Sequence, residues 1–113
     1  MNVAFGELFK SFCEYGATRI QTHTQQETSI DNARFIKMMR DCGLFDQKFT
    51  KTKADLIFSQ VRPRGTRRIG YQRFCKVALP LIATAKYPGI SAVEGVKRLV
   101  ETLLTSGGPS INS

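Results

Sequence analysis

Several features that commonly identify an enzyme are absent from the sequence. It contains a single histidine, His23, which therefore has no histidine partner for a metal site or a proton relay. We find no phosphate-binding P-loop, no nucleophile elbow, no pair of catalytic carboxylates and no zinc-ligand spacing. We therefore expect a protein that is not an enzyme and needs no cofactor, with His23 as an exposed loop residue.

Long apolar runs are also missing. No apolar segment follows a basic one near the N-terminus, as a secretory signal would require, and no stretch is apolar enough to span a membrane. The three cysteines, Cys13, Cys42 and Cys75, are odd in number and widely spaced, which favours reduced, buried thiols over a disulfide framework or a zinc site. We therefore expect a soluble, intracellular protein.

Acidic residues are few and unevenly distributed. The chain has 9 Asp and Glu against 17 Lys and Arg, a formal net charge of +8, and no acidic residue between Asp55 and Glu94. This excess favours nucleic acid, an anionic membrane surface or an acidic protein surface as partner, and charge alone does not choose among them. Because 113 residues with 42% hydrophobic content suffice for one core, we expect one domain over residues 1–105 and a disordered tail over residues 106–113.

Apolar residues recur with helical spacing in the first part of the chain. A helix is predicted from about residue 2 to residue 15 because large apolar side chains repeat at i, i+3, i+4 and i+7. A polar stretch, "ATRIQTHTQQETS", follows as a loop. Asp31 is then predicted to cap a second helix, and Gly43 to end it in the left-handed conformation, with Leu44 packing back over the turn. Met38 and Met39 lie on its apolar stripe, where core packing is favoured over a peptide-binding groove.

Three further helices are predicted from the same spacing. Thr52 resembles the N-cap of a capping box with Asp55, and the third helix stops before Pro63. The fourth has a clear apolar stripe that includes Tyr71, Phe74, Cys75, Ala78, Leu79 and Ile82. Pro80 within it removes a backbone donor and predicts a kink or an early end. Ser91 begins the fifth helix, with an apolar stripe of Val93, Val96, Val100 and Leu103.

Two helix–loop–helix units of similar size therefore lie in tandem. Each has one aliphatic residue just before its second helix, Ile30 in the first unit and Ile69 in the second. This is the layout of an EF-hand pair, in which the central aliphatic residues form a short two-strand contact. We predict an all-α fold: an EF-hand-like pair of degenerate units, with about five helices and a two-strand contact at Ile30 and Ile69.

The ligand positions of both loops argue against calcium. With Ile69 at position 8, loop positions 1, 3, 5 and 12 are Arg62, Arg64, Thr66 and Arg73. With Ile30 there, they are His23, Gln25, Glu27 and Arg34. Position 12 of a calcium loop is a bidentate carboxylate, and a guanidinium in its place repels a divalent cation. We predict that neither loop binds calcium.

The central half of the sequence resembles a known family. The segment "MMRDCGLFDQKFTKTKADLIFSQVRPRGTRRIGYQRFCKVALPLIATAKY" carries the Asp-Cys-Gly turn at 41–43, the Ala-Asp-Leu-Ile-Phe-Ser helix at 54–59, and Arg-Ile-Gly-Tyr-Gln-Arg-Phe at 68–74. These features are similar to the folded helical core of the tubulin polymerization-promoting protein family, over roughly residues 5 to 90. The resemblance implies an EF-hand-like fold without calcium, and a role in binding tubulin and in bundling or assembling microtubules. The family's longer members continue with a Gly-rich basic segment implicated in microtubule contact, where this sequence has "TSGGPSINS".

Six cations lie within fifteen residues of one another and form what we call the basic patch. They are Arg62, Arg64, Arg67, Arg68, Arg73 and Lys76. Because arginine forms bidentate contacts with carboxylates, the patch is a candidate docking surface for the acidic surface of tubulin, although such a charge run is equally typical of a solvated connector.

Three function classes follow. The first is a non-enzymatic tubulin- or microtubule-binding protein of the cytoplasm and cytoskeleton, promoting assembly or bundling, or associated with the axoneme of a cilium or flagellum. The second is a general protein-interaction adaptor that keeps the EF-hand-like fold and no longer binds tubulin. The third, a nucleic-acid binder, is disfavoured because the aromatic residues fall on core stripes and leave no stacking platform. The oligomeric state is open.

Overall fold

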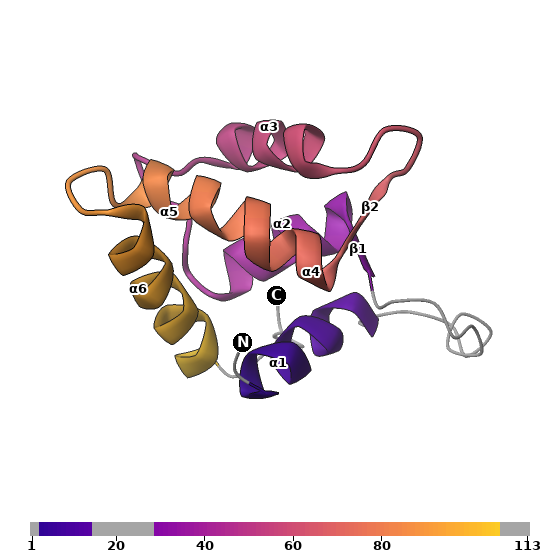
Figure 1. Cartoon of the computed structure of the whole chain (residues 1–113), viewed down its shortest axis with the longest axis horizontal. Coiled ribbons are helices and arrows are strands. Elements are labelled where there is room, and N and C mark those ends of the chain that lie inside the picture. Colours follow the sequence, from indigo (N-terminus) through magenta and orange to yellow (C-terminus); the bar gives the residue numbers. More distant parts are fainter. Residues whose placement is uncertain (1–2, 15–28, 107–113) are drawn as a thin grey trace.

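The computed structural model describes residues 3–14 and 29–106, which are mostly helical (Figure 1). The elements are α1 (Val3–Glu14), β1 (Ser29–Asp31), α2 (Asn32–Asp41), α3 (Lys51–Val61), β2 (Arg68–Gly70), α4 (Tyr71–Arg73), the π-helical turn η2 (Phe74–Ala78), α5 (Leu79–Lys86) and α6 (Ala92–Thr105). Since α4, η2 and α5 follow one another without a break, the predicted all-α fold of five helices is confirmed. The loop predictions at His23, Gln25 and Glu27 lie outside the described residues, as does the predicted tail at 106–113 except for Ser106. Ser106 is the C-cap of α6, and its hydroxyl donates to the Leu103 carbonyl at 2.7 Å.

The two helix–loop–helix units meet where the sequence places them. β1 and β2 are antiparallel, with Ser29 opposite Gly70, Ile30 opposite Ile69, and Asp31 opposite Arg68. Both isoleucine side chains are fully buried. The predicted two-strand contact is therefore confirmed. It brings the end of the second loop beside the start of α2.

Phenylalanine rings join the two units in the core. Phe74, from the second unit, lies with its ring centroid 4.9 Å from Phe9, 6.2 Å from Phe5 and 6.1 Å from Phe35. Phe35 in turn lies 5.4 Å from Phe58 of α3. Burying large rings is a major source of stability. These contacts therefore couple α1, α2 and α3 to the helix that starts at α4.

Both ends of α2 follow the local rules read from the sequence. Asp31 is extended, and its carboxylate accepts a hydrogen bond from the Arg34 amide at 2.9 Å, which satisfies one of the free amides of the first turn. At the other end, Gly43 has a φ of 71°, its amide donates to the Arg40 carbonyl, and the Leu44 amide donates to the Met39 carbonyl. This is a Schellman motif, and Leu44 is fully buried over it. The predictions for these residues are confirmed.

The methionines and cysteines also lie in or against the core. Met38 and Met39 are fully buried, which confirms that they pack in the core. Cys13 and Cys42 are buried and Cys75 is half-buried, and all three are free thiols. Burial therefore holds fully for two of the three cysteines. In residues 3–14 and 29–106, no helix combines the length and the apolar character needed to cross a membrane.

The predicted start of α3 is wrong by two residues. Its N-cap is Thr50, whose hydroxyl accepts from the Lys53 amide at 3.2 Å, and Thr52 lies within the helix. Phe49, just before the cap, is fully buried, so core packing fixes where the chain enters the helix. Asp55 is not a capping residue and instead accepts a hydrogen bond from Asn32 at 3.2 Å.

Two further predictions about the last helices need correction. Of the kink or early end predicted at Pro80, the early end is wrong, because the helix continues to Lys86. The backbone does depart from a regular α-helix close to the proline, in the π turn Phe74–Ala78 that precedes Leu79 and Pro80. Val93 is 71% exposed rather than on the buried stripe of α6. The buried face of α6 includes Gly95, where an added Cβ atom would lie 3.1 Å from the Cβ atom of Ala83 on α5. Two residues along a helix turn the side chain by about 200°, so Val93 faces away from α5.

Candidate partner-binding surface

The basic patch lies along the connection from α3 to α5. Arg62 is the C-cap of α3, Arg64 and Arg67 lie in the loop before β2, and Arg68 begins β2. The remaining two, Arg73 at the end of α4 and Lys76 in η2, lie on the helix that follows. All six residues are exposed. In Figure 1 the loop projects beyond the end of α3, on the side of the molecule away from α6.

Two arginines of the patch close the loop. The Arg62 guanidinium donates to the Thr66 carbonyl at 2.7 Å, and Arg73 Nε donates to the Val61 carbonyl at the end of α3. Gly65 makes the turn between them with a φ of 84°, which an L side chain adopts only with strain. Arg62 and Arg73 are the residues at loop positions 1 and 12. The side chains at these two positions, which in a calcium loop are ligands, thus donate to backbone carbonyls.

Arg68 connects the patch to the first unit. Its Nε donates to the Ser29 hydroxyl and its Nη2 to the Ser29 carbonyl, both at 2.7 Å. Its Nη1 also lies 3.8 Å from the Asp31 carboxylate, which pairs more closely with Arg34, at 2.6 Å. Arg68 therefore links β2 to β1 through Ser29, and the nearby Asp31 carboxylate compensates part of its charge.

The side chains of the other three cations are not engaged by the described part of the chain. Within residues 3–14 and 29–106, the side chains of Arg64, Arg67 and Lys76 form no hydrogen bond or ion pair. We call them the outer cations. Asp55, on α3, is already engaged: hydrogen bonds from Asn32 and then Lys51 hold the pKa of its carboxyl below the usual value. The outer cations are therefore available to an acidic partner.

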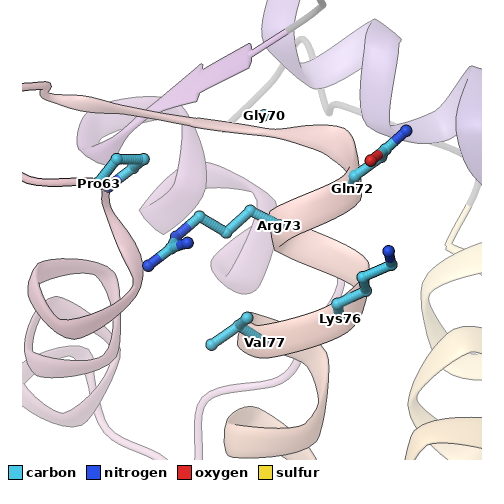
Figure 2. A pocket seen from close by; sticks show the side chains of 6 residues that line it. All are labelled: Pro63, Gly70, Gln72, Arg73, Lys76 and Val77. Atoms are coloured by element: carbon cyan, nitrogen blue, oxygen red, sulfur yellow. The ribbon is translucent and has the colours of Figure 1, made fainter.

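A shallow hollow of about 370 Å³ lies beside the patch, between the residues that follow α3 and the helix from α4 to η2. It is lined by Pro63, Gly70, Gln72, Arg73, Lys76 and Val77. Figure 2 shows that Arg73 extends across the hollow toward Pro63 and that Val77 points to the same side, whereas Gln72 and Lys76 point outward. The sequence identified the two cations but not the hollow.

Val77 carried a signal that sequence reasoning missed. It lies off the buried stripe of its helix, next to a lysine, and its side chain is 36% exposed. An apolar residue off the stripe and beside a cation could have marked a mixed surface. Pro63 and Gly70 gave no comparable signal, because each already has a role at the end of an element.

The structure also bears on metal and thiol chemistry. In the described part of the chain, no group of three His, Cys, Asp or Glu side chains is placed to hold a metal ion. Burial raises the pKa of Cys13 to about 12, and it also raises the pKa of the Cys42 and Cys75 thiols. A raised thiol pKa lowers the thiolate fraction and hence the reactivity. These three thiols are therefore poorly suited to act as nucleophiles.

Taken together, these features define an all-α protein in which two paired helix–loop–helix units present an arginine-rich loop. The family model described as p25-alpha matches residues 6–113, and the chain belongs to this family. The match confirms the resemblance seen in the sequence and extends it beyond residue 90.

Individual relatives agree with the family match. The chain is 30% identical to tubulin polymerization-promoting protein family member 2 of Bos taurus over 97 residues, 82% of this chain and 53% of that protein. It is 34% identical to family member 3 of Xenopus laevis over 96 residues, 81% of this chain and 51% of that protein. With the tubulin polymerization-promoting protein of Rattus norvegicus the identity is 30% over 110 residues, 96% and 47% of the two chains. The chain thus spans about half the length of the curated relatives it matches.

Proposed function

We propose that this protein is a non-enzymatic tubulin- or microtubule-binding protein and that the basic patch makes the contact. The names of its relatives support tubulin as the partner. The outer cations support the patch as the surface, because they are exposed and without partners among the described residues. That observation carries the proposal, since an exposed cation that pairs with none of the described residues can pair with a carboxylate of another protein.

In this proposal neither loop binds calcium. The paired units are EF-hand-like and fill residues 1–105 as one domain, with arginine side chains in place of an ion. Binding then depends on charge complementarity, which raises the association rate and weakens with added salt. We further propose that the protein is located on the cytoplasmic cytoskeleton. There it would promote microtubule assembly or bundling, or associate with an axoneme.

A second candidate function is a protein-interaction adaptor that does not bind tubulin. It follows from the chemistry of the outer cations, because exposed arginine and lysine side chains do not distinguish tubulin from other acidic proteins. The same surface would then bind another acidic protein. The two candidates differ only in the partner, and a direct binding experiment separates them.

Co-sedimentation with microtubules at low and physiological salt tests the proposal. We expect the chain to pellet with microtubules, with the bound fraction falling as salt rises. The double variant Arg64→Glu, Arg67→Glu should bind about tenfold more weakly or worse, since each exposed charge pair contributes roughly 0.2–1 kcal/mol and reversal adds repulsion. Arg68 is left unchanged because it holds Ser29.

The matched control is Lys97→Glu, Arg98→Glu. It changes the net charge by the same amount, at exposed residues of α6, away from the loop in Figure 1. Circular dichroism should show both variants folded. Equal loss of binding in both would mean that net charge, and not the basic patch, attracts the partner. Failure of the unaltered chain to pellet would favour the adaptor, and a shift of duplex DNA in a gel at physiological salt would favour nucleic-acid binding.

A further inference from the structure

The surface beside the basic patch is mixed rather than purely charged. Val77 and Leu81 are 36% and 37% exposed and lie four residues apart, so they share one face of the helix from η2 into α5. Arg73 lies a further four residues before Val77. A cation and two apolar side chains thus follow one another along a single helix face.

The hollow gives this face a concave end. Arg73 and Val77 both point into the space on the Pro63 side, and Lys76 stands at its rim (Figure 2). Gly70 contributes no side chain there, which leaves the space open. An apolar side chain can therefore enter beside Val77 while a carboxylate remains within reach of a cation.

Arg73 is held in position for such a carboxylate. Its Nε is used by the Val61 carbonyl, and its two Nη groups have no hydrogen-bond partner among the described residues. Fixing one donor restricts the side chain, so less conformational entropy is lost when the remaining donors bind an anion. No hydrogen bond from the described part of the chain restrains the side chains of the outer cations Arg64 and Arg67 in this way.

We propose that the face formed by Arg73, Val77 and Leu81 binds an acidic segment of a partner protein that also carries apolar side chains. In this arrangement the carboxylates bind Arg73 and Lys76, and the apolar side chains pack on Val77 and Leu81. The inference rests on the proposed function, in that the basic patch attracts an acidic protein, and it adds how such a protein is distinguished from other polyanions. A nucleic acid or an anionic membrane surface would use the cations and leave the two apolar residues without a role.

Two synthetic peptides of equal length and charge test this inference with the full chain. One alternates glutamate with leucine, and the other alternates glutamate with serine. We expect the leucine peptide to bind about fivefold more tightly by fluorescence anisotropy, as partial burial of apolar side chains should give. The variant Val77→Ser, Leu81→Ser should lose this preference while still binding the serine peptide as the unaltered chain does.

The matched control is Val3→Ser, Val93→Ser. These valines are 80% and 71% exposed on α1 and α6, so the control removes exposed apolar surface elsewhere. It should keep the preference for leucine. Equal affinity of the unaltered chain for the two peptides would overturn the inference, and so would a preference that survives in Val77→Ser, Leu81→Ser.

Microtubule binding separates this inference from the proposed function. If the chain binds the leucine peptide preferentially but does not pellet with microtubules, the inference stands and tubulin is the wrong partner. If it pellets with microtubules but does not distinguish the peptides, the proposed function stands and the inference is wrong. Tighter binding of duplex DNA or phosphatidylserine vesicles than of the leucine peptide, at physiological salt, would also overturn the inference.

Discussion

Replacing Phe74 with leucine tests whether one aromatic ring couples the two helix–loop–helix units. Phe74 is fully buried and lies 4.9–6.2 Å from three rings of the first unit, those of Phe5, Phe9 and Phe35. Leucine keeps an apolar side chain of similar volume but cannot form these ring pairs. The substitution therefore removes aromatic contacts rather than hydrophobicity.

The cost follows from those contacts. An aromatic pair is worth about 0.5–1.5 kcal/mol beyond its buried area, and a change of core shape usually costs below about 1.5 kcal/mol. Because neighbouring pairs are not additive, we expect Phe74→Leu to lower the free energy of unfolding by about 2–3 kcal/mol. A domain of this size has a total stability of about 5–15 kcal/mol, so the variant should remain folded but clearly weakened.

Urea denaturation followed by far-ultraviolet circular dichroism measures this change, with the slope m checked for constancy. Phe45→Leu is the matched control, because Phe45 is only half-buried and its ring partner in the described part of the chain is Phe49, at 5.6 Å. It should cost under about 1 kcal/mol. Equal costs for the two variants would show that the ring cluster around Phe74 does not hold the units together.

Three further predictions concern single residues. Gly43→Ala should lower stability by about 1–2 kcal/mol because alanine is strained at a φ of 71°, and Gly43→Asn should cost less; both are measured by urea denaturation. Hydrogen bonds from Lys86 and then the Phe49 amide hold the pKa of Asp46 below its usual value, so this contribution is present above about pH 4 and is lost as pH falls further. Asp46→Asn should accordingly flatten the dependence of Tm on pH in that acid range, and an unchanged slope would contradict the pairing. Since burial raises the pKa of Cys13 to about 12, a thiol reagent at pH 8 should modify the half-buried Cys75 first, as mapped by mass spectrometry, and rapid labelling of Cys13 in the native protein would be inconsistent with its burial.

Features with a local physical cause could be predicted from the sequence. Asp31 caps α2 because its short carboxylate reaches an amide three residues on, and Gly43 ends α2 because glycine tolerates a positive φ. Ile30 and Ile69 pair because each is the one aliphatic residue in front of a helix. In these places the residue type alone selects the conformation.

Features decided by packing could not be predicted in the same way. Thr50 and Thr52 are equally good N-caps, and the burial of Phe49 selects the first. Val93 has helical spacing with other apolar residues, but the close approach of Gly95 to Ala83 decides which face of α6 is covered. Each of these choices depends on a neighbour that is distant in the sequence or absent from the local pattern.

The sequence identifies the six cations of the basic patch but not the different contacts that each of them makes. Composition shows six cations, yet only the structure shows that Arg62, Arg68 and Arg73 bind groups within the chain. Every residue has a backbone carbonyl, so the sequence does not show which carbonyl accepts a hydrogen bond from an arginine side chain. The hollow beside Val77 was missed because it arises from the relative placement of two segments, not from either one.

The bond between Arg73 and the last carbonyl of α3 has a consequence for control of the protein. A loop that closes around an ion has an open and a closed form, and a pulse of that ion switches between them. Here the group that closes the loop is the Arg73 side chain. It belongs to the same molecule, so closing the loop does not depend on the concentration of an ion. The binding surface that we propose, formed by Arg73, Val77 and Leu81, would therefore need no ion to form. Its occupancy would depend on the concentration of the partner and on ionic strength rather than on a calcium signal.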